Sequence, residues 1–330
     1  MGKYLLRGLS DRFLNDLKDG ELEPYLKLVQ NDRTLELDIR DNKIYVFYRG
    51  GALYIISPNQ DANGYRFKNA FLDSIGNKVR NSSEIFSGGF WAKKAMALYN
   101  GSEYFEAIPY LKSVIDNHLC VIGGNDEKEF QQLLVRANNQ LSSPSPPKAD
   151  SVSLYTDYYF VGLEYQLFDT LEAKIDLIAV RYDTKKRNTS IGKVVLVEVK
   201  LGTGSFGGTS GIQKHISDVE KFFDNEAYVD ILKKEAVTIF QQKHLLGLID
   251  SAKPIEAISD EKPEFILVLA DATSNGEAVE KSLTPFQEPF ANFDLKIATS
   301  SAMGYALYAN RMLTVKKFLA ILNEIKIPPR

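Results

Sequence analysis

The segment Lys193–Lys200 constrains the fold more than any other part of the sequence. It reads Lys-Val-Val-Leu-Val-Glu-Val-Lys, so a continuous apolar run ends in an acid, one valine and a lysine. A short run of branched apolar residues is typical of a strand buried on both faces, as at the centre of an α/β sheet. Because side chains alternate along a strand, Glu198 and Lys200 are predicted to share one face.

The preceding apolar segment, residues 173–180, carries Asp176 at its centre. An isolated carboxylate is costly to bury, so it usually finds a cation, a metal ion or a proton. If the two segments are neighbouring strands, Asp176 converges with Glu198 and Lys200. Two carboxylates suit a hard cation such as Mg2+, and a lysine beside them suits charge on a phosphate. The alternative is an ordinary surface ion pair between Glu198 and Lys200, which would contribute little.

Residues 164–176 and 196–202 together resemble the core of the PD-(D/E)XK nuclease superfamily, which has the restriction-endonuclease-like fold. Carried onto this sequence, the resemblance implies that Asp176 and Glu198 bind Mg2+, with Mn2+ as a substitute, and that Lys200 is catalytic. Ile175 stands where many members have a proline. The implied activity is hydrolysis of phosphodiester bonds in nucleic acid, with DNA as the expected substrate.

The same resemblance adds two residues to the candidate site. Glu164 lies one predicted hairpin before Asp176 and matches an upstream acid that serves as a further metal or water ligand in many of these nucleases; the alternative is an exposed strand carboxylate. Gln213 begins a helix where RecB-like members carry Gln-x-x-x-Tyr, but Ser217 replaces the tyrosine here. Gln213 is expected either to assist at the phosphate or to lie on a polar helix face.

The net charge of −3 provides no global attraction to nucleic acid, so a local patch has to supply it. Positive charge is predicted to gather around the site from residues 185–187, Lys193, Lys200 and Lys214. The glycine- and serine-rich loop 202–211 is expected to close on nucleic acid.

Other candidates have plainer interpretations. His215 and Asp218 are predicted to form a solvent-exposed pair on one helix, and His118 and His244 to be ordinary helix residues. The aromatic segment 45–51 fits base stacking, although alternating aromatic residues are also typical of a core strand.

A serine- and proline-rich stretch, residues 142–152, is predicted to link two domains. Residues 1–141 are expected to form a smaller α+β domain of unknown role, with strands first and helices after them. Residues 153–330 are expected to form an α/β domain with a mixed central sheet flanked by helices. The predicted strands are 35–41, 43–48, 52–57, 160–167, 172–181, 193–201, 265–270 and 295–298, and the predicted helices are 90–99, 104–118, 127–141, 212–223, 228–248 and 314–325.

Cys120 is the only cysteine, which excludes an internal disulfide and any structural zinc site with two thiolates. No apolar run reaches the roughly 18 residues of a transmembrane helix, and the first residues carry no signal-peptide pattern. We therefore expect a cytoplasmic protein without a membrane partner. A homodimer is compatible with this expectation, because cutting both strands of a duplex needs two sites.

Two further hypotheses stay open at this point. The nuclease-like domain could be a catalytically silent module that binds nucleic acid or a protein partner, as in phage defence or mobile-element biology. The N-terminal domain could recognise a partner or a small signal and gate the nuclease. Metal binding that depends on Asp176 would distinguish an enzyme from a silent module.

Overall fold

The computed structural model describes residues 7–59, 64–69, 89–122, 126–139, 156–167, 173–182, 190–202, 206, 211–250, 253–270, 276–300, 307, 309 and 312–324. By its internal contacts the chain divides into two compact units. Unit 1 comprises Met1–Gln132 with Leu245–Leu248, and unit 2 comprises Leu133–His244 with Ile249–Arg330. The boundary between the units falls within helix α6 (Asp126–Asn139), and the predicted 142–152 linker lies outside the described residues.

Unit 1 contains a four-stranded antiparallel sheet in which neighbouring strands follow one another along the chain. Two of its turns have left-handed backbone at both central residues, first Asp41 and Asn42 (φ 49° and 56°), then Arg49 and Gly50 (φ 45° and 80°). Such turns match the twist of hairpin strands. The three predicted strands are confirmed, and a fourth is added at the edge. The strands are β1 (Leu35–Arg40), β2 (Lys43–Tyr48), β3 (Gly51–Pro58) and β4 (Tyr65–Lys68).

Two short helices precede this sheet, so the predicted order of strands first is wrong. Helix α1 (Asp11–Asp19) begins at Ser10, whose side chain accepts a hydrogen bond from the Phe13 N–H. Helix α2 (Glu23–Asn31) has a proline in its first turn. Each helix is nine residues long, which gives too few turns for a clear apolar period in the sequence. The predicted helices after the sheet are confirmed as α4 (Gly89–Asn100), α5 (Tyr104–Ile122) and α6.

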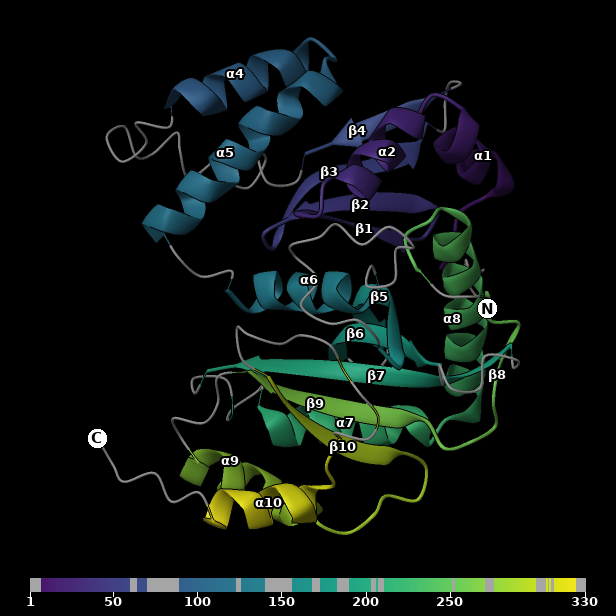
Figure 1. Ribbon diagram of the computed structural model, residues 1–330, viewed down its shortest axis with the longest axis vertical. Coiled ribbons are helices and arrows are strands. Elements are labelled where there is room, and N and C mark those ends of the chain that lie inside the picture. Colours follow the sequence, from purple (N-terminus) through teal and green to yellow (C-terminus); the bar gives the residue numbers. More distant parts are fainter. Residues whose placement is uncertain are drawn as a thin grey trace. The chain divides into compact units, whose positions relative to one another are not determined.

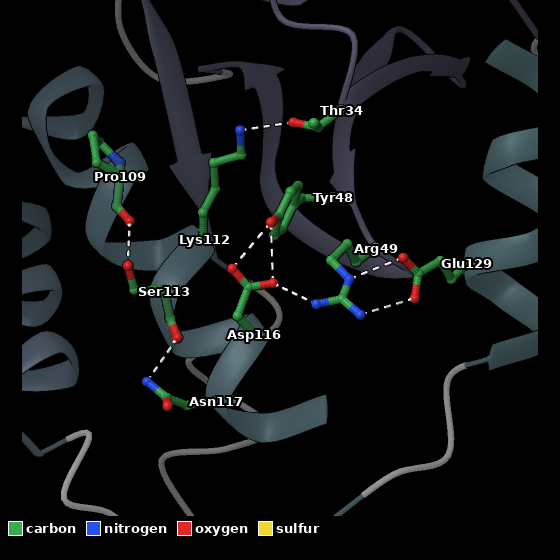
Figure 2. Close-up of polar contacts among 9 residues, drawn as sticks. All are labelled: Thr34, Tyr48, Arg49, Pro109, Lys112, Ser113, Asp116, Asn117 and Glu129. Carbon is green, nitrogen blue, oxygen red and sulfur yellow. Dashed lines mark hydrogen bonds and ion pairs between the residues drawn. The ribbon is translucent and has the colours of Figure 1, made fainter. Parts of the chain in front are cut away.

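A network of ion pairs anchors the turn between β2 and β3 to α5 and α6 (Figure 2). Arg49 donates to Asp116 at 2.7 Å and to Glu129 at 2.9 Å, and the Tyr48 hydroxyl donates to Asp116 at 3.0 Å. Burial and the Asp116 carboxylate raise the pKa of the Tyr48 hydroxyl to about 12. Because two carboxylates engage the Arg49 guanidinium, the network fixes this turn within unit 1.

Unit 2 is built on a mixed sheet with the strand order β10-β9-β7-β6-β5, and β8 pairs with the start of β7. Strand β9 runs parallel to β7 and β10, whereas β5, β6 and β7 form an antiparallel meander. The central strand β7 is buried along nearly its whole length, as its apolar run predicts. The strands are β5 (Tyr158–Leu167), β6 (Ala173–Arg181), β7 (Ile191–Leu201), β8 (Ala257–Ile258), β9 (Glu264–Ala270) and β10 (Asp294–Ser300).

Helices flank this sheet (Figure 1). Helix α7 contacts β6, and its Phe222 meets Tyr165 of β5 edge to face; Phe240 of α8 meets Tyr159 of β5 in the same way. At the other end of the strand order, α10 contacts β10. The helices are α7 (Ile212–Phe223), α8 (Glu226–Leu245), α9 (Gly276–Leu283) and α10 (Val315–Glu324), with a 3-10 helix at Thr284–Phe286.

The expected fold class is confirmed at the level of architecture. Unit 2 is an α/β structure with a mixed central sheet flanked by helices, and it is preceded by helices and an antiparallel sheet in unit 1. Within the described ranges, no helix combines the length and the apolar character needed to cross a membrane.

Candidate active site

Three neighbouring strands of unit 2 bring three acids to the same level of the sheet. In the antiparallel pair β5–β6, Leu163 lies opposite Leu177 and Tyr165 opposite Ile175, so Glu164 falls opposite Asp176. The pairing of β6 with β7 runs from Arg181 and Lys193 to Leu177 and Val197. Asp176 and Glu198 are the next residues on these two strands. The predicted convergence of Asp176 and Glu198 therefore follows from the register of the sheet.

Asp176 lies where the β6–β7 ladder ends. Its Oδ2 accepts a hydrogen bond from the Val199 N–H at 2.8 Å, so the side chain takes the place of a ladder carbonyl. This contact fixes the carboxylate against β7, one residue from Glu198. The Asp176 side chain is half-buried, which leaves one flank of the acid pair open to solvent.

Glu198 is the most enclosed of the three acids, with 2% of its side chain exposed. Its Oε1 accepts from Lys200 Nζ at 2.7 Å and lies 3.1 Å from His215 Nε2. Its Oε2 is also buried, and within the described part of the chain it has no hydrogen-bond partner. A buried carboxylate oxygen without a partner is costly, so this atom marks a place where a cation or a proton belongs.

The surroundings of Glu198 favour its protonated form when no cation is present. Burial, followed by the negative charge of Asp176, raises the pKa of Glu198 from 4.5 to about 8. Lys200 acts in the opposite direction but does not offset these two effects. Two adjacent acids that resist joint ionisation are a common arrangement at sites that bind a metal ion, because the cation replaces the shared proton.

The two subsidiary candidates lie in different settings. Glu164 is exposed and has left-handed backbone, with φ 47°, which is strained for a residue with a side chain. It stands opposite Asp176 in the register of β5 and β6. Gln213 is exposed in the first turn of α7, and its amide nitrogen lies 3.5 Å from the Ser282 carbonyl oxygen of α9. The strand register thus aligns Glu164 with Asp176, whereas the hydrogen bond of Gln213 is directed to α9.

His215 is the site residue that the sequence interpretation missed. The predicted surface pair of His215 and Asp218 is wrong, since Asp218 is buried and pairs with Lys214, while His215 lies against Glu198. The helical periodicity of the sequence indicates this position of His215. His215 is three residues after Ile212 and four before Val219, both fully buried, so it belongs to the inner face of α7.

The predicted positive patch is only partly assembled. Lys193 is buried and lies 3.6 Å from Glu264, and its odd position on β7 puts it on the sheet face opposite Glu198. The prediction that Lys193 surrounds the site is therefore wrong. Lys200 is buried against Glu198, and Lys214 keeps half of its side chain exposed. Residues 185–187 and most of loop 202–211 lie outside the described residues.

The aromatic segment of unit 1 has a separate arrangement. The rings of Tyr45 and Phe47 are stacked at 6.0 Å between centroids, and the Arg40 guanidinium lies 4.6 Å from the centre of the Tyr45 ring. Both rings are half-buried, whereas Val46 between them is in the core. Of the two other histidines, His244 lies on α8 as predicted, and His118 falls within α5.

The donor set at Glu198 and Asp176 fits a hard divalent cation in kind. Both donors are carboxylate oxygens, and the unpartnered Glu198 Oε2 is the atom that a cation would satisfy. No three His, Cys, Asp or Glu side chains among the described residues lie close enough to hold a metal ion by themselves. Mg2+ is commonly held by one or two carboxylates, with waters and substrate oxygens completing its shell, so two protein donors are sufficient for it.

Comparison of the chain with protein-family models, with curated proteins and with solved structures found no match in any of the three.

Proposed function

We propose that unit 2 is a metal-dependent nuclease of the PD-(D/E)XK type, which hydrolyses phosphodiester bonds of nucleic acid, with DNA as the expected substrate. The observation that carries the proposal is the environment of Glu198. One of its oxygens is held by Lys200, the other is buried without a hydrogen-bond partner in the described structure, and Asp176 stands on the adjacent strand. This arrangement of two acids and a lysine suits metal-assisted hydrolysis.

Each side chain has a role that follows from its position. Asp176 and Glu198 would hold Mg2+ or Mn2+, and Glu164 would add a ligand, directly or through water, from the solvent side. The bound cation supplies Lewis acidity toward the phosphate oxygens. Lys200 would orient the attacking water and stabilise the negative charge that develops on the phosphate oxygens.

The open flank of the site indicates how a substrate would approach. Glu164 is exposed and Asp176 is half-buried, whereas Glu198 and Lys200 are enclosed. A phosphodiester would therefore reach the acids from the side of β5 and β6. The exposed first turn of α7, with Gln213 and Lys214, offers polar and positively charged contacts to a nucleic-acid backbone.

A cleavage assay tests the proposal. Supercoiled plasmid, linear duplex, single-stranded DNA and RNA are incubated with the full chain in Mg2+, in Mn2+ or in EDTA. We expect cutting that requires the metal and is lost in both Asp176→Asn and Lys200→Met. Glu220→Gln, an exposed change on the outer side of α7, is the matched control and should cut like the unaltered protein. Equal cutting by all variants would show that Asp176 and Lys200 are not responsible for the cleavage and would overturn the proposal.

The second candidate function is a catalytically silent module that binds nucleic acid or a protein partner. One observation favours it, namely that no three potential ligands converge among the described residues. In that case the acid pair would remain protonated in part and bind no divalent cation. Absence of both cutting and Mn2+ binding, together with retained binding of nucleic acid, would support this second function.

A further inference from the structure

Glu198 is held from two different elements of unit 2. Lys200 reaches Oε1 from two residues along the same strand, at 2.7 Å, and His215 Nε2 approaches the same oxygen from α7 at 3.1 Å. Both contacts fall on Oε1, and Oε2 receives none from the described residues. The two oxygens of the Glu198 carboxylate therefore differ. Oε1 is held by Lys200 and His215, and Oε2 is left for a ligand.

Helix α7 is well placed to keep His215 where it is. Ile212, Ile216 and Val219 are fully buried and surround His215 on the inner face of the helix. The imidazole has only 15% of its surface exposed, so it has little room to take another rotamer. Because the backbone of α7 is fixed by these apolar contacts, the position of Nε2 relative to β7 is fixed as well.

Anchoring Oε1 has a direct consequence for ligand binding. A glutamate side chain rotates about three bonds and can bind a cation through either oxygen or both. The contact with Lys200 comes from the same strand and restrains this rotation at one point only. A second contact from another element removes that freedom, so Oε2 is held in one orientation before a cation arrives.

We propose that His215 is a positioning residue, which holds Glu198 through Oε1 so that Oε2 is presented to a divalent cation as a single-oxygen ligand. This inference rests on the proposed function of the acid pair as a metal site. It assigns His215 an action through Glu198, because its Nε2 lies against the carboxylate oxygen that Lys200 also holds.

The test measures binding of Mn2+ alone, by calorimetry and by electron paramagnetic resonance, in the full chain without nucleic acid. A glutamine amide nitrogen has the same reach from the backbone as imidazole Nε2, whereas an asparagine amide reaches only as far as Nδ1. We expect His215→Gln to keep most of the affinity, and His215→Asn and His215→Ala to lower it by about 10- to 100-fold. His244→Gln on α8 is the control and should bind as the unaltered protein does.

Pulsed resonance of the bound Mn2+ separates positioning from direct ligation. A positioning role predicts no strong coupling of the manganese to a ring nitrogen of His215. A strong coupling that disappears in His215→Gln would overturn the proposal and make His215 a ligand. If His215→Ala does not fold, judged by circular dichroism, the comparison of the Gln and Asn variants still decides.

The outcomes for this inference and for the proposed function are distinguishable. If the unaltered protein binds Mn2+, Glu198→Gln abolishes binding and His215→Asn binds normally, only the positioning role is wrong. If the unaltered protein binds no Mn2+ at all, the metal site and the role of His215 are both wrong.

Discussion

The Asp176 carboxylate accepts a hydrogen bond from the Val199 N–H at 2.8 Å, immediately beyond the last paired residues of β6 and β7. This contact joins a structural role to the proposed chemical one. One carboxylate oxygen closes the ladder between the two strands, and the same group carries the negative charge that faces Glu198. The two roles are separable, because an amide can accept the hydrogen bond but cannot supply the charge.

The first prediction concerns Asp176→Asn and Asp176→Ala. The asparagine Oδ1 can accept from Val199 N–H, so its free energy of unfolding should stay within about 1 kcal/mol of the unaltered value. The alanine variant leaves that N–H without its acceptor and should lose about 1–3 kcal/mol. Both should lose cleavage and Mn2+ affinity by on the order of 100-fold or more. Urea unfolding and calorimetry measure the two effects, and equal destabilisation by both variants would refute the separation of roles.

The second prediction is a dependence on pH that arises at Glu198. Burial and the charge of Asp176 raise the pKa of this carboxyl to about 8 in the folded protein, against 4.5 ordinarily. The folded chain therefore holds a proton that the unfolded chain releases, so stability without metal should fall as pH rises from 4.5 to about 8 and then level off.

Binding of a cation displaces the same proton. Metal affinity should consequently rise toward pH 8, and calorimetry at pH 7 in buffers of different ionisation enthalpy should detect release of a proton. The glutamine of Glu198→Gln cannot ionise, so the free energy of unfolding of this variant should not fall with pH in this way. If the free energy of unfolding that depends on Glu198 instead rose with pH over this range, the carboxyl would be ionised in the folded protein and the prediction would be wrong.

The central strands were predictable from sequence because their physics is local. Residues 194–197 are all apolar and residues 173–180 mostly so, which is typical of strands at the centre of a sheet. The period of two then places Glu198 and Lys200 on one face, and the structure brings Lys200 Nζ to 2.7 Å from Glu198. The meander of β5, β6 and β7 follows from the short connections between these strands.

The residues that sequence interpretation misplaced depend on contacts with distant parts of the chain. Whether His215 faces solvent or the sheet is decided by how α7 packs, and its own side chain is compatible with either. Lys193 lies close to Glu198 along the chain, but its partner Glu264 belongs to β9. The sequence around a residue shows which strand it belongs to. Whether its position is odd or even along that strand decides which face of the sheet its side chain lies on.

The third prediction separates catalysis from metal binding at Lys200. Lys200→Met removes the cation from a buried pair while keeping a side chain of similar length. Lys200 lowers the pKa of Glu198, so the carboxyl of the variant should stay protonated to a higher pH, and the fold should be retained at neutral pH. Cleavage should fall by on the order of 100- to 1,000-fold when Mn2+ is saturating. Loss of Mn2+ binding to the same extent as cleavage would mean that Lys200 acts by organising the metal site.

The fourth prediction concerns Glu264, a second buried acid of unit 2 whose role we expect to be structural. Glu264 is fully buried, accepts from the Tyr158 hydroxyl at 2.9 Å and pairs with Arg181 and Lys193. It lies opposite Val195 in the register of β7 and β9, so it is on the sheet face opposite Glu198. Glu264→Gln removes the buried counter-charge of these cations and of Lys296, 3.9 Å away, and should cost about 3–5 kcal/mol of stability.

The same variant should leave Mn2+ affinity unchanged, because its carboxylate lies on the other side of the sheet from the acid pair. Glu261→Gln is the matched control, since Glu261 is 68% exposed, lies 4.0 Å from Lys193 and should contribute at most about 1 kcal/mol. Thermal unfolding and Mn2+ titration on both variants test this division. If Mn2+ affinity fell in Glu264→Gln while the protein was still folded, the two faces of the sheet would be coupled through β7, and the buried network would have to be counted as part of the metal site.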